Sequence, residues 1–186
     1  MSFEDDLNQS KKGVRFVSDF FSILGRKLDI CLDEPSKNNK HPPDLIETLD
    51  DGFKAFFEVK EDGRSIQTGN VFFEEKALYQ FSLEAKKQGC FAFLILIPYY
   101  DPRPLFYYVS NELRQELEIL RQSNRAKLVT KDDTGSGWIV PIVEARDMSS
   151  NIVSRFLSPE EQMIFSALFK AQILTLENHI FKRWIK

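Results

Sequence analysis

The chain has 186 residues, which is long enough for one domain with a substantial apolar core. Hydrophobic residues make up 42% of it, including seventeen Phe, and this content excludes a disordered chain. The formal net charge is −3, which does not favour a nucleic-acid binder and does not exclude one. No apolar run approaches the length of about 18 residues that a membrane-spanning helix needs, so we expect no membrane partner.

The two cysteines are too few for a disulfide framework or a zinc site, and they favour a reducing compartment. They are Cys31 and Cys90. The first residues are acidic and lack the apolar stretch of a signal peptide. A cytoplasmic location is therefore expected.

The first part of the chain is expected to form a helix followed by a hairpin. Apolar residues recur at three- and four-residue steps, which predicts a helix over 7–28, and a short strand over 29–32 follows. After a polar loop, strands are predicted over 44–48 and 53–60, joined by a turn that contains glycine.

Helices and strands alternate through the rest of the chain. The predicted elements are an apolar segment over 68–74 behind a turn, a helix over 75–88, strands over 90–97 and 104–109, a helix over 110–122, a hairpin of 126–129 with 137–143, and a helix from Ser158 almost to Lys186. No linker is visible, so we expect one α/β domain over 1–186. Its architecture would be a central mixed β-sheet flanked by helices, with a core over 1–110 and a C-terminal extension over 126–186.

Three charged residues gather on the predicted hairpin. Glu58 and Lys60 are two apart on one strand and therefore leave the same face, and the turn would bring Asp44 beside them. Two carboxylates and an ammonium make a poor core, but they suit a divalent cation and a phosphate. Mg²⁺ or Mn²⁺ would bind Asp44, Glu58 and the backbone carbonyl of Val59. In hydrolysis of a phosphodiester, Lys60 would hold the water that attacks the phosphorus or stabilise the charge that develops on the phosphate oxygens. The alternative to a metal site is a solvated strand edge, with Glu58 and Lys60 as ordinary surface residues.

The motif of Pro43-Asp44 followed by Glu58-Val59-Lys60 resembles the PD-(D/E)xK phosphodiesterase (restriction-endonuclease-like) superfamily. That group includes many restriction enzymes, archaeal Holliday-junction resolvases, and nucleases of phages and mobile elements. The segments 68–74, 106–109 and 137–141 resemble the phage and mobile-element type of member, and their order along the chain matches it.

The resemblance implies a restriction-endonuclease-like core and metal-dependent hydrolysis of DNA, or of RNA. It also implies catalytic roles for Asp44, Glu58 and Lys60. Many members carry a metal-supporting glutamate on the first helix, but the equivalent place here is near the apolar Val14. Glu74 is the candidate for a third acid.

Three polar residues are weaker candidates for contacts with nucleic acid. Gln80 lies on the helix where related nucleases often direct a polar residue toward DNA. Gln67 and Asn70 either contact phosphate or cap their turn.

Three functional hypotheses stay open. The first is a metal-dependent DNA endonuclease. The second is a catalytically weak or inactive nuclease-fold module that binds nucleic acid or a protein partner. The third is an unrelated α/β interaction protein.

The last predicted helix has two apolar rows, whereas the surface of a monomer needs only one. This surplus predicts a homodimer. The alternative is a helix that is buried between the sheet and other helices of the same chain. The rows are Phe165, Phe169, Ile173, Leu176, Ile180 and Trp184 in the first, and Met163, Ala167, Leu174, Phe181 and Ile185 in the second.

Overall fold

The computed structural model of the chain describes residues 3–31, 43–50, 52–131 and 135–175. Its centre is a five-stranded sheet in the order β1-β2-β3-β5-β6, and all neighbours run antiparallel except β3 and β5, which are parallel. The predicted central mixed sheet is therefore confirmed. Its strands are β1 (Leu28–Ile30), β2 (Leu45–Thr48), β3 (Lys54–Asp62), β5 (Phe91–Pro98) and β6 (Leu105–Tyr108).

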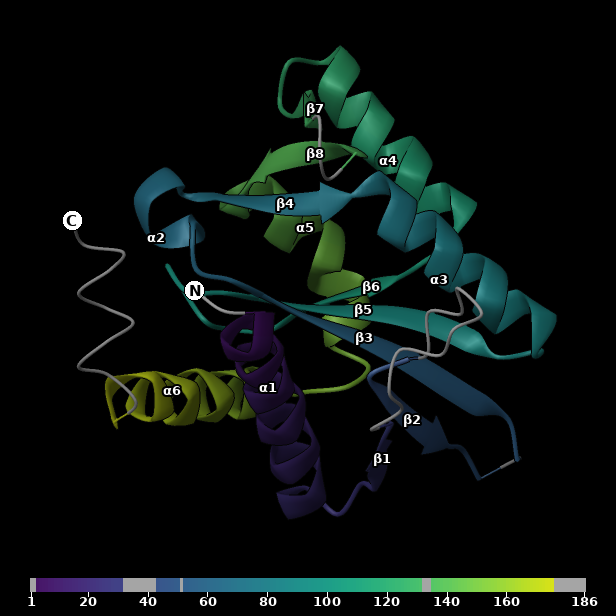
Figure 1. Ribbon diagram of the computed structural model, residues 1–186, viewed down its shortest axis with the longest axis vertical. Helices are drawn as coiled ribbons and strands as arrows, with labels where there is room; N and C mark the ends of the chain where they lie inside the picture. Colours follow the sequence, from purple (N-terminus) through teal and green to yellow (C-terminus); the bar gives the residue numbers. More distant parts are fainter. Residues whose placement is uncertain (1–2, 32–42, 51, 132–134, 176–186) are drawn as a thin grey trace.

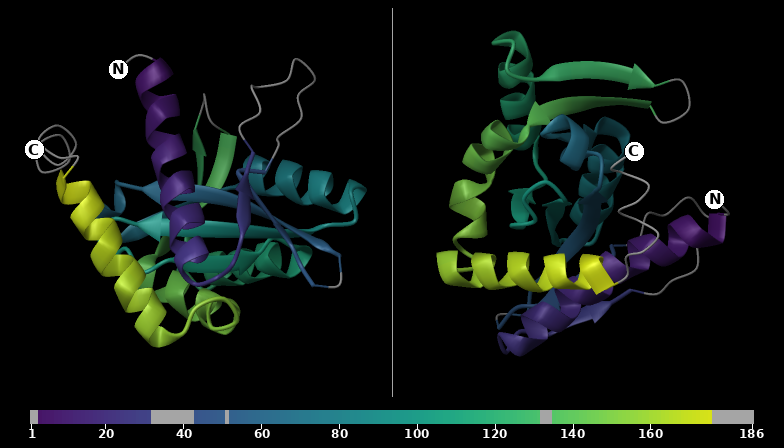
Figure 2. Two further views of the ribbon diagram at one scale, coloured as in Figure 1. Left: turned by 90° about the horizontal axis from the view of Figure 1, so that it is seen from below. Right: turned by 90° about the vertical axis from the view of Figure 1, so that its left-hand side faces the viewer.

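Helices cover one face of this sheet directly. The long helices α1 (Phe3–Ile23) and α6 (Pro159–Thr175) cross each other there (Figure 2), and the ring of Phe16 packs edge-on against Phe165 at 4.9 Å. Apolar residues of β3 and β5 that point to this side complete a buried core, including Phe57, Val59 and Ile95.

The opposite face carries a second layer built from helices and a small sheet (Figure 1). The three strands of that sheet, in the order β4-β8-β7, are β4 (Asn70–Glu74), β8 (Gly135–Pro141) and β7 (Lys127–Lys131). The helices are α2 (Ser65–Thr68), α3 (Glu75–Lys87), α4 (Asn111–Gln122) and α5 (Ile142–Val153). Phe56, Leu94 and Leu96 of the central sheet face this layer and share its core.

The first helix ends earlier than the apolar pattern predicted, at Ile23 and not at Leu28. Gly25 adopts a positive φ of 78° and terminates the helix, because the Arg26 N–H then turns back to the Phe21 carbonyl at 2.9 Å. Leu28 opens β1 instead, so the expected strand over 29–32 is shifted toward the N-terminus.

The apolar segment ending at Glu74 forms a strand, and that strand pairs with β8 in the separate sheet. One expectation for the second half of the chain was wrong in detail. The predicted strand over 137–143 stops at Pro141, because residues from Ile142 onward form α5. The buried side chains of α5 recur at three- and four-residue steps, a helical signal that the strand interpretation overlooked: Ile142, Ala145, Ser149 and Val153.

The helix predicted to begin at Ser158 is confirmed with its cap. The Glu161 N–H donates to Ser158 Oγ at 3.2 Å, and the Ser158 N–H donates to Glu161 Oε2 at 2.6 Å. This reciprocal pair is a capping box.

A partly buried ion pair ties the turn after α1 to β2. Arg26 donates to both carboxylate oxygens of Glu47, at 2.8 and 2.6 Å, and its guanidinium lies over the Phe21 and Phe156 rings.

Because Glu47→Ala leaves the Arg26 cation without this carboxylate, the free energy of unfolding should fall by about 3 kcal/mol. In the exposed pair of Lys27 and Asp29, the change Asp29→Ala should cost about 0.5 kcal/mol or less. Urea unfolding followed by circular dichroism measures both changes, and equal effects would contradict the role of burial.

Candidate active site

The pairing of β2 with β3 brings the predicted acidic residues together. Leu45 lies opposite Phe57 in the antiparallel ladder, and the Asp44 N–H donates to the Phe57 carbonyl at 2.9 Å. One further step in this register places Asp44 beside Glu58, and directly opposed residues share a face of the sheet. The Val59 N–H donates to Asp44 Oδ2 at 2.7 Å, which fixes the carboxylate at the end of β2.

Glu58 and Lys60 leave the same face of β3, as the alternation predicted. Lys60 Nζ lies 2.6 Å from Glu58 Oε1. Glu58 is buried and only 5% exposed, whereas the side chain of Lys60 is 47% exposed. The pair therefore presents a buried carboxylate and a cation that solvent, or a substrate, can reach.

Burial and like charge act strongly on Asp44. Desolvation and then repulsion from Glu58 raise its pKa from 3.8 to about 7, although the Val59 N–H and Lys60 work in the opposite direction. At Lys60, desolvation lowers the pKa, but Glu58, through its charge and its hydrogen bond, raises it above the ordinary value together with Asp44 and Glu74. Lys60 is thus a stable cation, suited to electrostatic work and not to proton abstraction.

The donor set fits one small divalent cation. Within the described ranges no group of three or more His, Cys, Asp or Glu side chains is placed to hold a metal. Mg²⁺, however, commonly takes one or two carboxylates and keeps several waters, and Asp44 and Glu58 are such a pair. The N–H and the carbonyl of a strand residue point to the same edge of the strand. Since the Val59 N–H points to Asp44, the Val59 carbonyl points to that edge too. Val59 lies beyond Leu45↔Phe57, the last pair between β2 and β3. A bound cation would relieve the repulsion between the carboxylates of Asp44 and Glu58, which contributes to the raised pKa of Asp44.

A cleft of about 330 Å³ opens beside the pair. It lies between the central sheet and the second layer, and Glu58 and Lys60 line it together with Glu74. Glu74 therefore faces the same space as the lysine. Asp44 is not among the residues that line the cleft.

No residue of the first helix joins a group of three or more possible metal ligands among the side chains that the structure describes. Val14 is buried, and its neighbour Gly13 lies so close to Glu61 that an added Cβ would clash with the carboxylate. Glu61 also accepts a hydrogen bond from the Tyr99 hydroxyl, and burial raises its pKa. This acid was not singled out in the sequence because it leaves β3 on the face opposite Lys60.

None of the three polar candidates for nucleic-acid contact lines the cleft. Gln67 is exposed in α2 and Gln80 is exposed in α3. Asn70 donates through Nδ2 to the Thr68 carbonyl at 2.7 Å, which is the turn-capping role. Contacts of these residues with phosphate stay predictions.

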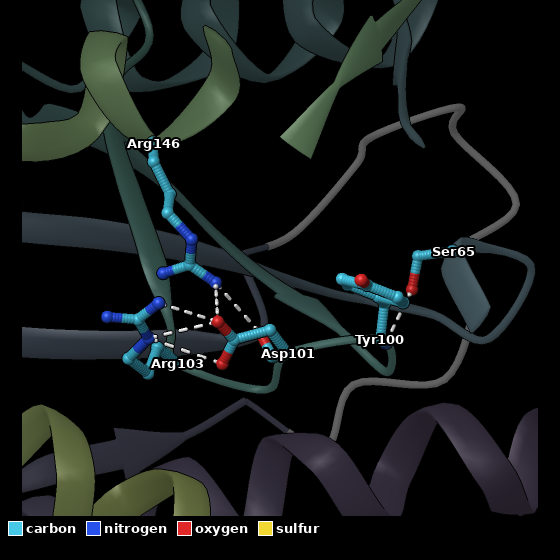
Figure 3. Close-up of polar contacts among 5 residues, drawn as sticks. All are labelled: Ser65, Tyr100, Asp101, Arg103 and Arg146. Atoms are coloured by element: carbon cyan, nitrogen blue, oxygen red, sulfur yellow. Dashed lines mark hydrogen bonds and ion pairs between the residues drawn. The ribbon is translucent and has the colours of Figure 1, made fainter. Parts of the chain in front are cut away.

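The loop after β5 is hydrogen-bonded to α2 (Figure 3). The Tyr100 N–H donates to Ser65 Oγ at 3.0 Å, and the Ser65 hydroxyl donates to the Asp62 carbonyl at 2.6 Å. In the same loop Asp101 pairs with Arg103 at 2.6 Å and with Arg146 of α5 at 2.8 Å. Desolvation works against ionisation of Asp101, but these cations lower its pKa overall. The ion cluster fixes the loop that in turn positions residues 62–65.

The comparisons with known proteins concern the fold. No protein-family model matches the chain, and the search of curated proteins found no significant match. A similar solved structure is that of Hjc, a Holliday junction resolvase from the archaeal hyperthermophile Archaeoglobus fulgidus. The two are 16% identical with a TM-score of 0.46, over 79% of this chain and 99% of that one.

In the part of the chain that the structure describes, no helix has the length and apolarity to cross a membrane. The chain has the mixed α/β sheet flanked by helices that its resemblance to the PD-(D/E)xK superfamily implied. Of the motif residues, Glu58 and Lys60 lie on β3, and Asp44, directly before β2, accepts a hydrogen bond from the Val59 N–H of that strand.

Proposed function

We propose that this chain is a divalent-metal-dependent endonuclease that hydrolyses phosphodiester bonds of DNA. The observation that carries the proposal is the arrangement of Asp44, Glu58 and Lys60. Pairing of β2 with β3 places two carboxylates together on one face, and a lysine with a raised pKa lies 2.6 Å from one of them. This arrangement pairs a cation site with a fixed positive charge. We further propose that the chain acts in the cytoplasm.

The residues divide the chemistry between them. Asp44, Glu58 and the Val59 carbonyl would hold the Mg²⁺ or Mn²⁺. The ion, when bound, would neutralise the phosphate and lower the pKa of a coordinated water. Lys60 stays protonated and directs its ammonium to the oxygens that gain charge as the water attacks. Glu58 holds Lys60 in place through their ion pair.

A second candidate function is a catalytically weak or inactive nuclease-fold module that binds nucleic acid or a protein. The observation that favours it is that no three-acid group occurs among the described residues and that Val14 is buried where the first helix would supply an acid. The intact set of Asp44, Glu58 and Lys60 favours the enzyme.

Incubation of the purified chain with labelled DNA and RNA separates these functions. The panel contains duplex, single-stranded and branched forms, each with Mg²⁺, Mn²⁺ or EDTA. We expect metal-dependent cleavage of DNA, and products with internal ends that identify an endonuclease. Binding of DNA without cleavage in either metal would support the module instead.

We also propose that the chain forms a homodimer through α6. Phe165 and Phe169 of the first apolar row pack into the core, but the outer side of the helix exposes Met163, Ile164 and Leu168. A second copy is the partner that would cover this apolar strip with a matching one. The rows continue into residues that lie outside the described ranges.

Light scattering at tens of micromolar protein tests the dimer. The wild-type mass should be twice 21.7 kDa, and Leu168→Asp should halve it because a charge enters an apolar interface. Lys170→Asp, at an exposed polar position of the same helix, is the control and should leave the mass unchanged. A wild-type mass near 21.7 kDa would rule out the dimer.

A further inference from the structure

The cleft beside Lys60 is lined by charged and apolar residues. The charged residues include Glu58, Lys60 and Asp62 of β3, and Arg64 follows in the turn after that strand. The other walls are mostly apolar. They come from the central sheet, from β4 and from α3: Leu94, Leu96, Phe72, Ala77, Leu78 and Phe81.

The volume of the cleft restricts what can enter it. At about 330 Å³ it lies at the lower end of the sizes that small-molecule sites have. A double helix is far too wide for it, but a single nucleobase with its sugar is of suitable size. Of the residues that line the cleft, metal coordination needs only Glu58, so the proposed hydrolysis alone leaves the apolar walls without a role.

The wall at Phe72 is held in place by neighbouring groups. The Phe72 N–H donates to Asp62 Oδ2 at 3.1 Å, which ties β4 to the end of β3. On the adjacent strand, Gly137 leaves room for the ring, because a Cβ there would lie 2.5 Å from Phe72 Cζ. The aromatic wall is therefore preorganised next to the catalytic strand.

Resting on the function proposed above, we propose that this cleft receives one unpaired nucleotide of the strand being cut. Its phosphate would lie at Lys60 and its base against Phe72 and Leu78. A base offers apolar faces that stack on an aromatic ring. Its polar edge would meet the carboxylate of Glu74 and the guanidinium of Arg64, which also line the cleft, because an acid accepts from amino groups and arginine donates to ring acceptors.

This assignment narrows the substrate class. A paired nucleotide must leave its stack before it can enter the cleft, whereas an unpaired one enters at least cost. The preferred substrate is therefore DNA with an unpaired nucleotide next to the scissile phosphate, and not an uninterrupted duplex.

Two duplexes that differ only by one unpaired nucleotide test the assignment. With Mg²⁺ or Mn²⁺, wild-type kcat/KM should be about tenfold higher or more on the bulged duplex, as expected for one stacked base. Ala77→Trp fills the cleft and should remove most of this preference. Lys76→Trp, on the exposed side of the same helix, adds the same bulk outside the cleft and should retain it.

A binding measurement keeps the assignment independent of cleavage. The bulged duplex carries 2-aminopurine at the unpaired position, and Ca²⁺ replaces Mg²⁺. Binding of wild-type protein should quench the fluorescence by stacking, and Phe72→Leu, which removes the aromatic face but keeps an apolar side chain, should reduce the quenching. Equal cleavage of both duplexes overturns the assignment but leaves the endonuclease standing. Quenching without cleavage of any DNA supports the cleft and counts against the endonuclease, and no quenching by wild-type protein overturns the cleft.

Discussion

Glu58→Gln is expected to lower metal-dependent DNA cleavage by about a thousandfold or more. The change removes a buried negative charge that both binds the cation and orients Lys60. Asp44→Asn and Lys60→Ala should each have an effect of similar size. Because the three residues act as one unit, the double variant Asp44→Asn with Glu58→Gln should lose little more than either single variant.

The measurement is single-turnover cleavage at saturating Mg²⁺, with the fold of each variant checked by circular dichroism. Glu116→Gln, an exposed acid of α4, is the matched control and should keep the wild-type rate. A folded Glu58→Gln protein that cuts DNA within a few-fold of the wild-type rate would remove Glu58 from the active site.

Asp44→Asn is expected to stabilise the metal-free protein at pH 8 while it abolishes cleavage. Desolvation and Glu58 raise the pKa of Asp44 to about 7, from an ordinary value of 3.8. An acid with a raised pKa holds its proton more tightly in the native state than in the unfolded state. The contribution of Asp44 to stability is therefore greatest at low pH and falls as pH rises between these two values.

Asparagine stays neutral throughout this range and can still accept the Val59 N–H. The gain at pH 8 should be on the order of 2 to 4 kcal/mol, or roughly 5 to 15 °C in Tm for a chain of this size. Thermal unfolding in EDTA at pH 5 and pH 8 measures it. The variant should exceed the wild type at pH 8, and the difference should shrink at pH 5, where wild-type Asp44 is protonated. A variant less stable than the wild type at pH 8 would mean that burial and Glu58 do not destabilise the ionised Asp44 in the native state.

The strand that carries the proposed catalytic residues, β3, could be predicted from sequence because its signal is local. Alternation along one strand fixed the common face of Glu58 and Lys60, and a glycine turn fixed the hairpin that brings Asp44 to them. The cap at Ser158 was equally local, since it depends on residues three apart.

The second layer depends on contacts between distant residues and could not be found in this way. Nothing near Asn70 in the sequence indicates that its strand pairs with a strand ending at Pro141. The cleft is formed where β4 and α3 of that layer meet the central sheet, so its apolar walls combine Phe72 with Leu94. Glu61 was missed for a related reason, since its partners Gly13 and Tyr99 come from remote elements.

Binding of Mn²⁺, followed by titration calorimetry, tests most directly whether Asp44 and Glu58 hold one ion. The wild-type protein should bind one ion per chain, more tightly at pH 8 than at pH 6, because the ion must displace the proton that Asp44 retains up to a pH of about 7. Glu58→Gln should weaken binding by about tenfold or more, and Glu116→Gln should not change it. Equal affinity in wild type and Glu58→Gln would contradict the site.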